Sequence, residues 1–596
     1  MEKIKRVFDL LAHNKEVYNN LEVLAAKSKG EWIKYYSQDF AEITNSVSKG
    51  LIKKGIKKDD KVGIMSENRP EWNFCDFGIM QIGAVQVPMY PTLAESDIQF
   101  ILEDAEINLI FVSTAELYQK LSRIISAVGH EIPLYTFEQV EGAKHWTEIK
   151  EEGEKSEDIN LDDYRNQISG DDLLTLIYTS GTTGTPKGVM LTHTNLLSNI
   201  EASSRLYPEG MRKALSFLPL SHIFERMVVY MYFYLGVSVY YAESLDTIVV
   251  NLAEVKPHCF TAVPRLLEKV YDRIVAKGHA LTGIKKQLFF WALNLGLKYE
   301  VDGANGFWYE LQLKIARKLV FSKWREALGG EIMIIVSGGA ALQERLARVF
   351  WSADLKVLEG YGLTETSPVI SVNGSKKGQV RFGTVGKPLF NVEVKIAEDG
   401  EILCKGPSLM KGYYKRPDAT EEAVTDGWFH TGDIGTLKDG FLAITDRKKE
   451  VFKTAGGKYV APQVLENKLK ESVYIEQVIV VGENRRFPAA LIVPDYEKIA
   501  GWAARNGINE TNKDVLAKNE QVFNKLWSEV ERLSDSFGKW EKVKKIALLT
   551  KEFTIDGGEL TPKLSLRRKV ILNNYAAVIN SIYMGEEHNE LDRDIQ

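Results

Sequence analysis

A loop rich in glycine and hydroxyl residues follows an apolar run in the first third of the chain. Residues 173–177 read LLTLI, and residues 178–188 read YTSGTTGTPKG. The first run predicts a buried strand and the second a loop that leaves it. Glycines let backbone N–H groups turn toward an anion, hydroxyls add donors, and Lys187 adds a positive charge. The loop therefore predicts a phosphate site, although its spacing differs from that of a Walker A loop.

A second glycine-rich motif follows the run KVLE at residues 356–359. It reads GYGLTET and spans residues 360–366. A tyrosine between glycines offers a flat face for adenine, while Thr364 and Glu365 supply a hydroxyl and a carboxylate beside a phosphate. A carboxylate in that place could hold Mg²⁺. Alone this motif is weak, but the phosphate loop upstream favours a nucleotide site.

A third motif, DGWFHTGDIG at residues 426–435, places Asp433 in a predicted turn. Its carboxylate could accept two hydroxyl hydrogen bonds, as a ribose diol would supply. A lone aspartate in a turn more often forms a local Asx-turn. The two preceding motifs favour the ribose interpretation.

In this order, the motifs resemble those of the adenylate-forming enzymes, the superfamily of acyl-CoA synthetases, peptide-synthetase adenylation domains and luciferases. The resemblance runs from about residue 30 to 575, and residues 426–449 resemble the signature of fatty-acyl-CoA synthetases. It implies that ATP activates a carboxylate. It assigns ATP or AMP binding to Thr179, Ser180, Gly181, Thr182, Thr183, Gly184, Lys187, Gly338, Gly360, Tyr361, Gly362, Thr364, Asp433 and Arg447, and Mg²⁺ binding to Thr183 and Glu365.

The run PLSHIFER at residues 219–226 precedes the apolar segment 227–242. A lone histidine is more often structural, but the resemblance places His222 near the carboxylate that is activated and the apolar residues along the acyl pocket. It also places residues 337–341, SGGAA, between the adenine and the acyl group. The catalytic residues that the resemblance implies are Lys187, His222, Glu365, Lys453 and Lys563.

Two half-reactions explain why the family has a mobile C-terminal domain. Adenylation joins two anions, whereas thiol attack on the adenylate needs another approach path. Residues 446–447 are the expected hinge, because a charged position at the end of an element absorbs a backbone rotation at the cost of solvation only. Lys453 and the glycine loop formed by Gly456, Gly457 and Lys458 resemble the loop that enters for thioester formation.

The loop expected to bring the adenylation lysine departs from the family pattern. In the segment 558–569, the lysine falls where this chain has Ser565. Lys563 lies two residues earlier and is the expected substitute, because residues i and i+2 of an extended chain share a face. Arg567 is the competing cation.

Composition limits the class of protein. The chain has 596 residues and a net charge of −5, with 76 basic and 81 acidic residues, which gives no bulk attraction for nucleic acid. Three widely spaced cysteines favour a reducing compartment. The N-terminus lacks a secretion signal, and segment 227–242 is shorter than a membrane span. We therefore expect a cytoplasmic protein. Peripheral contact with the inner face of the membrane, and a monomeric or homodimeric state, stay open.

Short apolar runs alternate with amphipathic helical patterns and predict an α/β fold. The expected strands include 214–218, 237–241, 259–263 and 332–336, and the expected helices 193–205, 246–255, 264–277 and 341–353. We expect a large N-terminal domain of layered α/β subdomains over residues 1–446, with a small β-barrel-like subdomain from about 380. A smaller, mobile α+β C-terminal domain would span residues 447–596.

An aromatic-rich segment, residues 283–330, should be helical. Core packing is the expected role of its aromatics, with a membrane-leaning surface or an acyl tunnel as alternatives.

The sequence as a whole predicts an ATP- and Mg²⁺-dependent long-chain fatty-acyl-CoA synthetase that uses fatty acid, ATP and CoA. The alternatives are a fatty-acyl-AMP ligase that loads a carrier protein and a catalytically impaired nucleotide- and lipid-binding homologue, which only the Ser565 departure supports.

Overall fold

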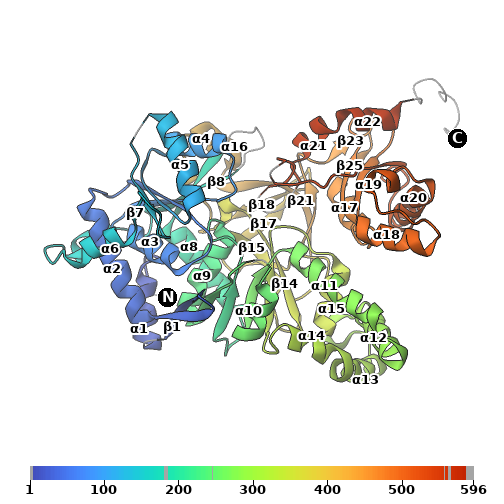
Figure 1. The fold of residues 1–596 in the computed structure, drawn as a ribbon, viewed down its shortest axis with the longest axis horizontal. Coiled ribbons are helices and arrows are strands. Elements are labelled where there is room, and N and C mark those ends of the chain that lie inside the picture. The colour runs from blue at the N-terminus through green and yellow to red at the C-terminus, as the bar shows by residue number, and fades with distance from the viewer. Residues whose placement is uncertain are drawn as a thin grey trace. The chain divides into compact units, whose positions relative to one another are not determined.

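The computed structural model describes residues 4–19, 21–129, 131–179, 186–244, 246–555, 557–561 and 566–584 (Figure 1). The chain divides into two compact units. The first comprises Met1–Lys395, Leu403–Thr431 and Leu437–Leu442, and the second Ile396–Ile402, Gly432–Thr436 and Ala443–Gln596. The predicted α/β class, with a large N-terminal part and a smaller C-terminal part, is confirmed. The boundary after residue 446 stays a prediction.

The first unit contains an eight-stranded sheet in the order β19-β9-β8-β4-β3-β5-β6-β7. Strands β3, β4 and β5 run parallel, and β8 and β9 form an antiparallel pair. The strands are β3 (Lys61–Met65), β4 (Val85–Met89), β5 (Ile107–Val112), β6 (Leu134–Thr136), β7 (Lys144–His145), β8 (Leu173–Thr179), β9 (Lys187–Thr192) and β19 (Gly412–Tyr413). The accompanying helices are α1 (Asp9–Tyr18), α2 (Ser37–Lys53), α3 (Pro70–Met80), α4 (Glu95–Ala105), α5 (Ala115–Val128), α6 (Thr147–Glu154) and α7 (Leu161–Arg165).

A nine-stranded sheet of the same unit has the order β16-β15-β14-β13-β12-β10-β11-β1-β2. Its strands are β1 (Glu22–Ser28), β2 (Glu31–Tyr36), β10 (Lys213–Ser216), β11 (Ser238–Tyr241), β12 (Cys259–Ala262), β13 (Ile334–Ser337), β14 (Lys356–Gly362), β15 (Val369–Val372) and β16 (Lys387–Pro388). The helices are α8 (His193–Ser204), α10 (Ile248–Val255), α11 (Pro264–Ala280) and α15 (Glu344–Ser352). The four strands and four helices predicted in this region are confirmed, with ends shifted by at most three residues.

Helix α9 (Ile223–Leu235) joins the two sheets through a buried arginine. The side chain of Arg226 is fully buried and forms an ion pair with Asp76 on α3. Its Nη1 donates to Thr175 Oγ1 on β8 at 2.8 Å, and its Nε donates to the hydroxyl of Tyr230 at 2.6 Å. Burial without these acceptors would cost several kcal/mol, so the network specifies where α9 lies.

The residue before this arginine faces the other sheet. Glu225 is buried, and its carboxyl accepts a hydrogen bond from Ser216 Oγ on β10 at 2.6 Å and another from Thr261 Oγ1 on β12. The helix ends at Gly236, whose φ of +66° and contact with the Tyr18 ring leave no room for a Cβ atom. Two neighbouring side chains thus anchor one helix to both sheets.

The aromatic-rich segment is helical, as predicted, but not all of it is core. It forms α12 (Gly283–Gly296), η1 (Val301–Gly303), α13 (Phe307–Ala316), η2 (Arg317–Phe321) and α14 (Ser322–Ala327). Phe289 is buried, which agrees with the core interpretation. Phe307 and Trp308 are 75% and 73% exposed, so that interpretation is wrong for them.

A third sheet of five strands has the order β17-β18-β21-β20, with β22 paired to β21. Its strands are β17 (Glu393–Ile396), β18 (Glu401–Lys405), β20 (Val424–Thr425), β21 (Trp428–Lys438) and β22 (Phe441–Arg447), and helix α16 (Pro417–Ala423) precedes β20. This half-barrel sheet corresponds to the predicted β-barrel-like subdomain.

From residue 450 onward the second unit is an α+β arrangement, as predicted. Strands β25 (Ile475–Val481), β26 (Ala489–Pro494) and β27 (Lys545–Leu548) form one sheet, and β23 (Phe452–Lys453) pairs with β24 (Tyr459–Val460). The helices are α17 (Pro462–Leu469), α18 (Tyr496–Arg505), α19 (Lys513–Leu516), α20 (Glu520–Ser534), α21 (Arg568–Asn574) and α22 (Ala576–Tyr583). Within the described residues, no helix combines the length and apolar composition that a membrane crossing requires.

The buried ion pair gives a stability prediction. Arg226→Met should lower the free energy of unfolding by about 3–5 kcal/mol, because Asp76 then keeps an uncompensated buried charge. The double variant Arg226→Met/Asp76→Leu should recover most of that loss. Urea unfolding followed by tryptophan fluorescence measures both effects.

A surface pair provides the matched control. Arg205 pairs with Glu201 at 2.9 Å, and its side chain is 58% exposed. Arg205→Met should therefore change stability by less than about 1 kcal/mol. A double variant at residues 76 and 226 that is less stable than either single variant would contradict the buried-pair interpretation.

Candidate functional site

The predicted phosphate loop connects two antiparallel strands. Thr179, the last residue of β8, lies opposite Lys187, the first residue of β9. Ser180, Gly181, Thr182, Thr183 and Gly184 lie outside the described residues. The strand before the loop is fixed at two points, by Thr175 beside Arg226 and by Tyr178, whose hydroxyl donates to Asp104 at 2.6 Å.

The structure brings the predicted loop lysine and the predicted metal ligand onto one tyrosine. Lys187 Nζ lies 5.0 Å from the ring centroid of Tyr413, and the Tyr413 hydroxyl donates to Glu365 Oε1 at 3.0 Å. Tyr413 reaches this place because β19 pairs with β9. A cation, an aromatic face and a carboxylate therefore come from three distant parts of the chain.

The backbone of Glu365, the residue that supplies this carboxylate, is itself fixed. Glu365 lies in η3 (Thr364–Thr366), directly after β14, and its carbonyl accepts the Met410 N–H at 2.8 Å. Burial, together with the neighbouring Glu365, raises the pKa of Tyr413, so its hydroxyl remains a donor. A carboxylate that is half-buried and fixed in this way suits Mg²⁺, which commonly takes one or two carboxylates and phosphate oxygens.

Glycines line the carboxyl ends of adjacent parallel strands. Gly338, after β13, would place a Cβ atom 3.3 Å from the Phe224 ring and 3.7 Å from the Gly360 carbonyl. Gly362 admits no side chain, because its Cβ atom would lie 1.8 Å from the Pro368 carbonyl oxygen. Between the two β14 glycines, Tyr361 is half-buried. Ligands of α/β sheets bind at this end of the strands.

His222 stands at the N-terminus of α9. Its Nδ1 accepts the Phe224 N–H at 3.0 Å, so the ring serves as the helix N-cap. In the neutral ring the proton is then on Nε2, which leaves that atom as a donor. The position at a helix N-terminus favours a nearby anion. Phe224 also contacts Gly338, which joins His222 to the glycine-lined end of the sheet.

In the second unit, the two residues predicted at the ribose are neighbours. Arg447 Nε lies 3.7 Å from Asp433 Oδ1, and the Arg447 side chain is 60% exposed whereas that of Asp433 is 9% exposed. The sheet fixes Asp433 because β21 and β22 pair. Their roles stay predictions.

The residue before Arg447 does not fit the reasoning that placed the hinge there. Asp446 is buried, and its carboxylate accepts the N–H groups of Arg447 at 2.6 Å and Gln463 at 3.0 Å. Burial raises its pKa to about 7. A rotation at this residue would break two partly buried hydrogen bonds, so the assumption of a cost in solvation only is wrong for Asp446.

The predicted thioester loop is the exposed tip of a hairpin. Lys453 on β23 lies opposite Tyr459 on β24, with its Nζ 4.6 Å from the tyrosine ring centroid. At the tip, Gly457 has a φ of +75°, and Lys458 Nζ lies 5.6 Å from the Trp540 ring. Gly456 has open space around it, with Thr454 Oγ1 at 3.9 Å. The tip can therefore approach a ligand with its backbone.

Lys563 and Ser565 lie outside the described residues. The residues that flank them are fixed: Leu560 bridges to Leu566, and the Arg567 N–H donates to the Glu559 carbonyl at 2.7 Å. Arg567, the competing cation, is therefore tied by its backbone to Glu559.

Comparison with known proteins identifies the family. The model of the AMP-binding enzyme family matches residues 11–414, and that of the AMP-binding enzyme C-terminal domain matches residues 450–587. The chain belongs to this family. The resemblance to the adenylate-forming enzymes is thereby confirmed.

Relatives of this AMP-binding enzyme are similar over nearly their whole length. "Long-chain-fatty-acid–CoA ligase FadD15" of Mycobacterium bovis is 35% identical over 94% of this chain and 93% of its own length. "Long-chain-fatty-acid–CoA ligase 1" of Homo sapiens is 32% identical over 93% and 82%. The solved adenylation domain of a carboxylate reductase from Mycobacterium chelonae superimposes with a TM-score of 0.76 at 21% identity, covering 97% and 91%, and shows the same fold.

Sequence reasoning missed three residues of this site. Tyr413 carries no local signal, because only the β9–β19 pairing brings it to Lys187. Glu225 and Arg226 did carry a signal in the sequence, because they are adjacent, oppositely charged residues beside an apolar stretch. Such residues are rarely buried unless they are paired or hydrogen-bonded, so their position indicates buried partners.

The buried carboxyl of Glu225, three residues after His222 in the chain, gives a pH prediction. Burial raises the pKa of Glu225 from 4.5 to about 7, and the Ser216 and Thr261 hydroxyls only partly offset this. The pKa of Glu225 is higher in the folded state than in the unfolded state. Its ionisation therefore lowers the free energy of unfolding progressively from about pH 4.5 to above pH 7, and has no effect below that range.

The free energy of unfolding of Glu225→Gln, minus that of the parent, should therefore increase as the pH rises. Between pH 4 and pH 8.5 this difference should grow by about 3 kcal/mol. Unfolding midpoints in urea across this range measure the difference. Glu421→Gln, an exposed position on α16, is the control and should give a flat difference. A flat profile for Glu225→Gln would mean that Glu225 titrates alike in both states.

Proposed function

We propose that this chain is an AMP-forming ligase that activates a long-chain fatty acid with ATP and transfers the acyl group to CoA. One observation of the structure carries the proposal, namely the convergence of Lys187 and Glu365 on Tyr413 in the AMP-binding domain. Both curated relatives described above are named as long-chain fatty acid CoA ligases. Their names support the same substrate class here.

In the first half-reaction, a carboxylate oxygen bonds to the α-phosphorus and the bond to pyrophosphate breaks. Lys187 balances the charge of the phosphates, and the Nε2–H of His222 orients the carboxylate. Tyr361 stacks on adenine, while Asp433 and Arg447 bind the ribose hydroxyls. Bound Mg²⁺, held by Glu365 and Thr183, would screen the phosphate charge. Lys563 supplies the further cation.

In the second half-reaction, the CoA sulfur bonds to the acyl carbon and AMP leaves. The exposed hairpin tip at Gly456, Gly457 and Lys458 approaches the pantetheine with its backbone, and Lys453 balances charge beside it. The alternative acceptor is a carrier protein, and the second alternative is a binding protein without turnover. Both are outcomes of the test below.

Two variants separate the half-reactions. Asp433→Ala should abolish ATP–pyrophosphate exchange, because loss of a charged acceptor costs about 1.5–3 kcal/mol in binding and misplaces the nucleotide. Gly456→Leu should keep exchange and lose CoA-dependent acyl-CoA formation by at least about tenfold, since its side chain fills the space for the thiol. Gly456 is a better position than Gly457, where the positive φ would add backbone strain.

The substrate is palmitate, with exchange and thioester formation measured on the same enzyme preparation. Exchange without any CoA-dependent product would favour the carrier-protein ligase, and absence of both activities in the parent chain would favour the impaired homologue. Gly501→Leu, at a half-buried position of α18, controls for a leucine added to the second unit. A Cβ atom at this position would have only Arg505 Nη1, at 3.9 Å, within 4 Å.

The same enzyme works in the cytoplasm and contacts the inner face of the membrane through α13. Along α13 and η2, the apolar residues Phe307, Trp308, Leu311, Ile315 and Leu319 are 44–75% exposed. Residues 283–330 hold eight basic and four acidic residues, a net charge of +4 in a chain of net charge −5. An exposed apolar stripe with surrounding lysines fits the surface of an anionic bilayer.

Vesicle sedimentation tests this contact. The chain should pellet with vesicles that contain phosphatidylglycerol and remain in solution with pure phosphatidylcholine. Phe307→Ser/Trp308→Ser should reduce binding at least about fivefold, because two interfacial aromatics are lost. Phe390→Ser removes a phenylalanine that is 59% exposed elsewhere in the first unit and should bind like the parent. Equal loss in both variants would overturn the α13 contact.

A further inference from the structure

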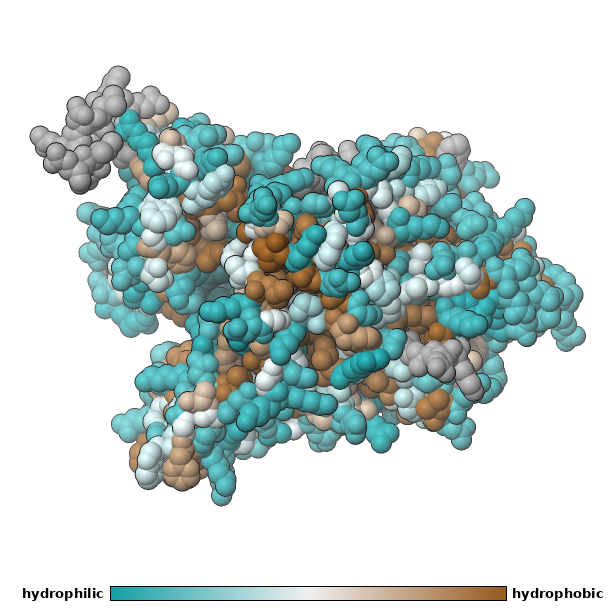
Figure 2. All heavy atoms as spheres, turned by 180° about the vertical axis from the view of Figure 1, so that it is seen from behind, coloured by the Kyte–Doolittle hydropathy of each residue, from teal (hydrophilic) through white to brown (hydrophobic). Residues whose placement is uncertain are grey.

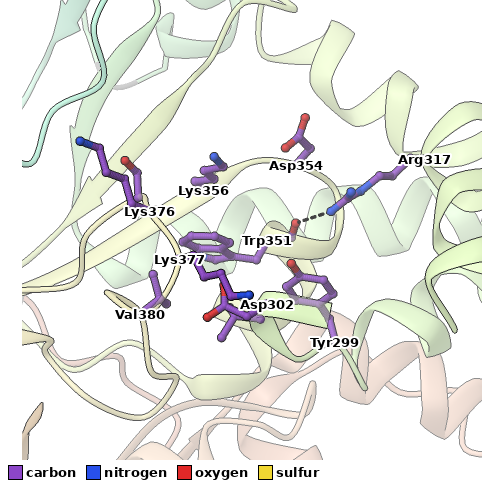
Figure 3. A pocket seen from close by; sticks show the side chains of 11 residues that line it. Tyr299, Asp302, Arg317, Trp351, Asp354, Lys356, Lys376, Lys377 and Val380 are labelled. Carbon is purple, nitrogen blue, oxygen red and sulfur yellow. Dashed lines mark hydrogen bonds between the residues drawn. The ribbon is translucent and has the colours of Figure 1, made fainter. Parts of the chain in front are cut away.

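A small cavity in the first unit carries more positive charge than its surroundings neutralise. The geometry points to a phosphate-binding site in this cavity, separate from the residues assigned to ATP. Its volume is about 250 Å³ (Figure 3). The lining residues are Tyr299, Val301, Asp302, Arg317, Trp351, Asp354, Lys356, Ser375, Lys376, Lys377 and Val380.

The cavity lies at the opposite end of β14 from the nucleotide motif. Lys356 begins that strand, whereas Tyr361 stands near its carboxyl end, about 16 Å further along. Because β15 runs antiparallel to β14, the chain after Val372 returns to the Lys356 end and brings Lys376 and Lys377 there. An anion in this cavity therefore does not occupy the predicted ATP site.

Four basic side chains and two carboxylates line the cavity, and one of the carboxylates is paired with an arginine that is not part of the lining. Asp302 Oδ2 accepts the Gly378 N–H at 3.0 Å, and Asp354 pairs with Arg325 at 3.2 Å. Lys356, Lys376 and Lys377 form no ion pair with any carboxylate in the described parts of the chain. The cations thus repel one another across a shared space, and a bound anion would relieve that repulsion.

Hydrogen bonds within the chain fix part of the cavity wall. Trp351 Nε1 donates to the Val357 carbonyl at 2.8 Å, which sets the ring at the centre of the view in Figure 3. Arg317 Nε donates to the Ser352 carbonyl at 2.8 Å, a neutral acceptor that leaves the guanidinium charge in place. The loop that carries Lys376 and Lys377 is held by the hydrogen bond from the Gly378 N–H to Asp302. These parts of the wall need no reordering on binding, whereas the exposed side chains of Lys376 and Lys377 would lose rotamer freedom.

The ligand that suits these groups is a phosphate dianion. Lysine ammonium groups bind phosphate as point charges, and arginine adds directed N–H donors. The volume is below the range of about 300–1,000 Å³ that is usual for larger organic ligands. The site therefore takes inorganic phosphate or pyrophosphate, or the phosphate end of a nucleotide whose remainder stays outside.

Calorimetric titration of the full chain at low salt tests the site with inorganic phosphate, pyrophosphate and 3′,5′-ADP. Lys376→Gln/Lys377→Gln should weaken phosphate binding about tenfold, the effect of losing a charge-assisted hydrogen bond. Lys314→Gln/Lys318→Gln is the matched control, because it removes two exposed lysines of α13 and η2 that do not line the cavity. Its affinity should equal that of the parent.

Equal weakening in the two lysine pairs would overturn the proposal, since surface charge alone would then explain binding. Unchanged affinity in Lys376→Gln/Lys377→Gln, or no binding in the parent, would overturn it as well. Tighter binding of 3′,5′-ADP than of phosphate would assign the site to a nucleotide, and equal or weaker binding would assign it to the free anions. ATP–pyrophosphate exchange should be the same in all variants, so the outcome is independent of the proposed catalytic function.

Discussion

The buried pair of Arg226 and Asp76 is the interaction on which the first unit depends most. Isolated charges are too costly to bury, so Arg226 can lie in the core only where Asp76, Thr175 and Tyr230 meet it. That condition sets α9 against α3 and against the strand that leads into the phosphate loop. Hydrophobic burial alone would allow α9 to slide or rotate, whereas the pair permits one position.

From this anchor the candidate site follows in steps. With α9 fixed, His222 stands at its N-terminus and Phe224 meets the glycine at the end of β13. The sheet register then places the glycines of β14 next to it, and η3 turns Glu365 toward Tyr413. Each step uses backbone geometry that only a small residue or a paired polar group can satisfy. The chemistry is thus assembled from strand ends and one helix end.

Much of the fold could be predicted because its strands are short apolar runs separated by clear helical patterns. The strand at 259–262 and the helix that begins at Pro264 are examples. Features that depend on tertiary pairing could not be predicted from the sequence. Tyr413 looks like any aromatic before a turn. Asp446 looks like part of a charged surface stretch, although it is buried and accepts the Gln463 N–H in the first turn of α17. The exposure of Phe307 escaped prediction for the same reason, because composition does not say which face of a helix is covered.

Glu225 shows how a buried carboxyl can avoid carrying a charge at a helix N-terminus. It lies in the first turn of α9, three residues after His222, where the helix carries a partial positive charge of about half a unit. An ionised carboxyl there would cancel that charge near His222, the residue that we propose orients the substrate carboxylate. Because burial raises its pKa to about 7, the group is largely neutral in slightly acidic solution. Burial sets this raised pKa, and the hydroxyls of Ser216 and Thr261 lower it in part because they favour the ionised form. These hydroxyls therefore hold the helix and also influence the pH at which the N-terminus of α9 ceases to attract an anion.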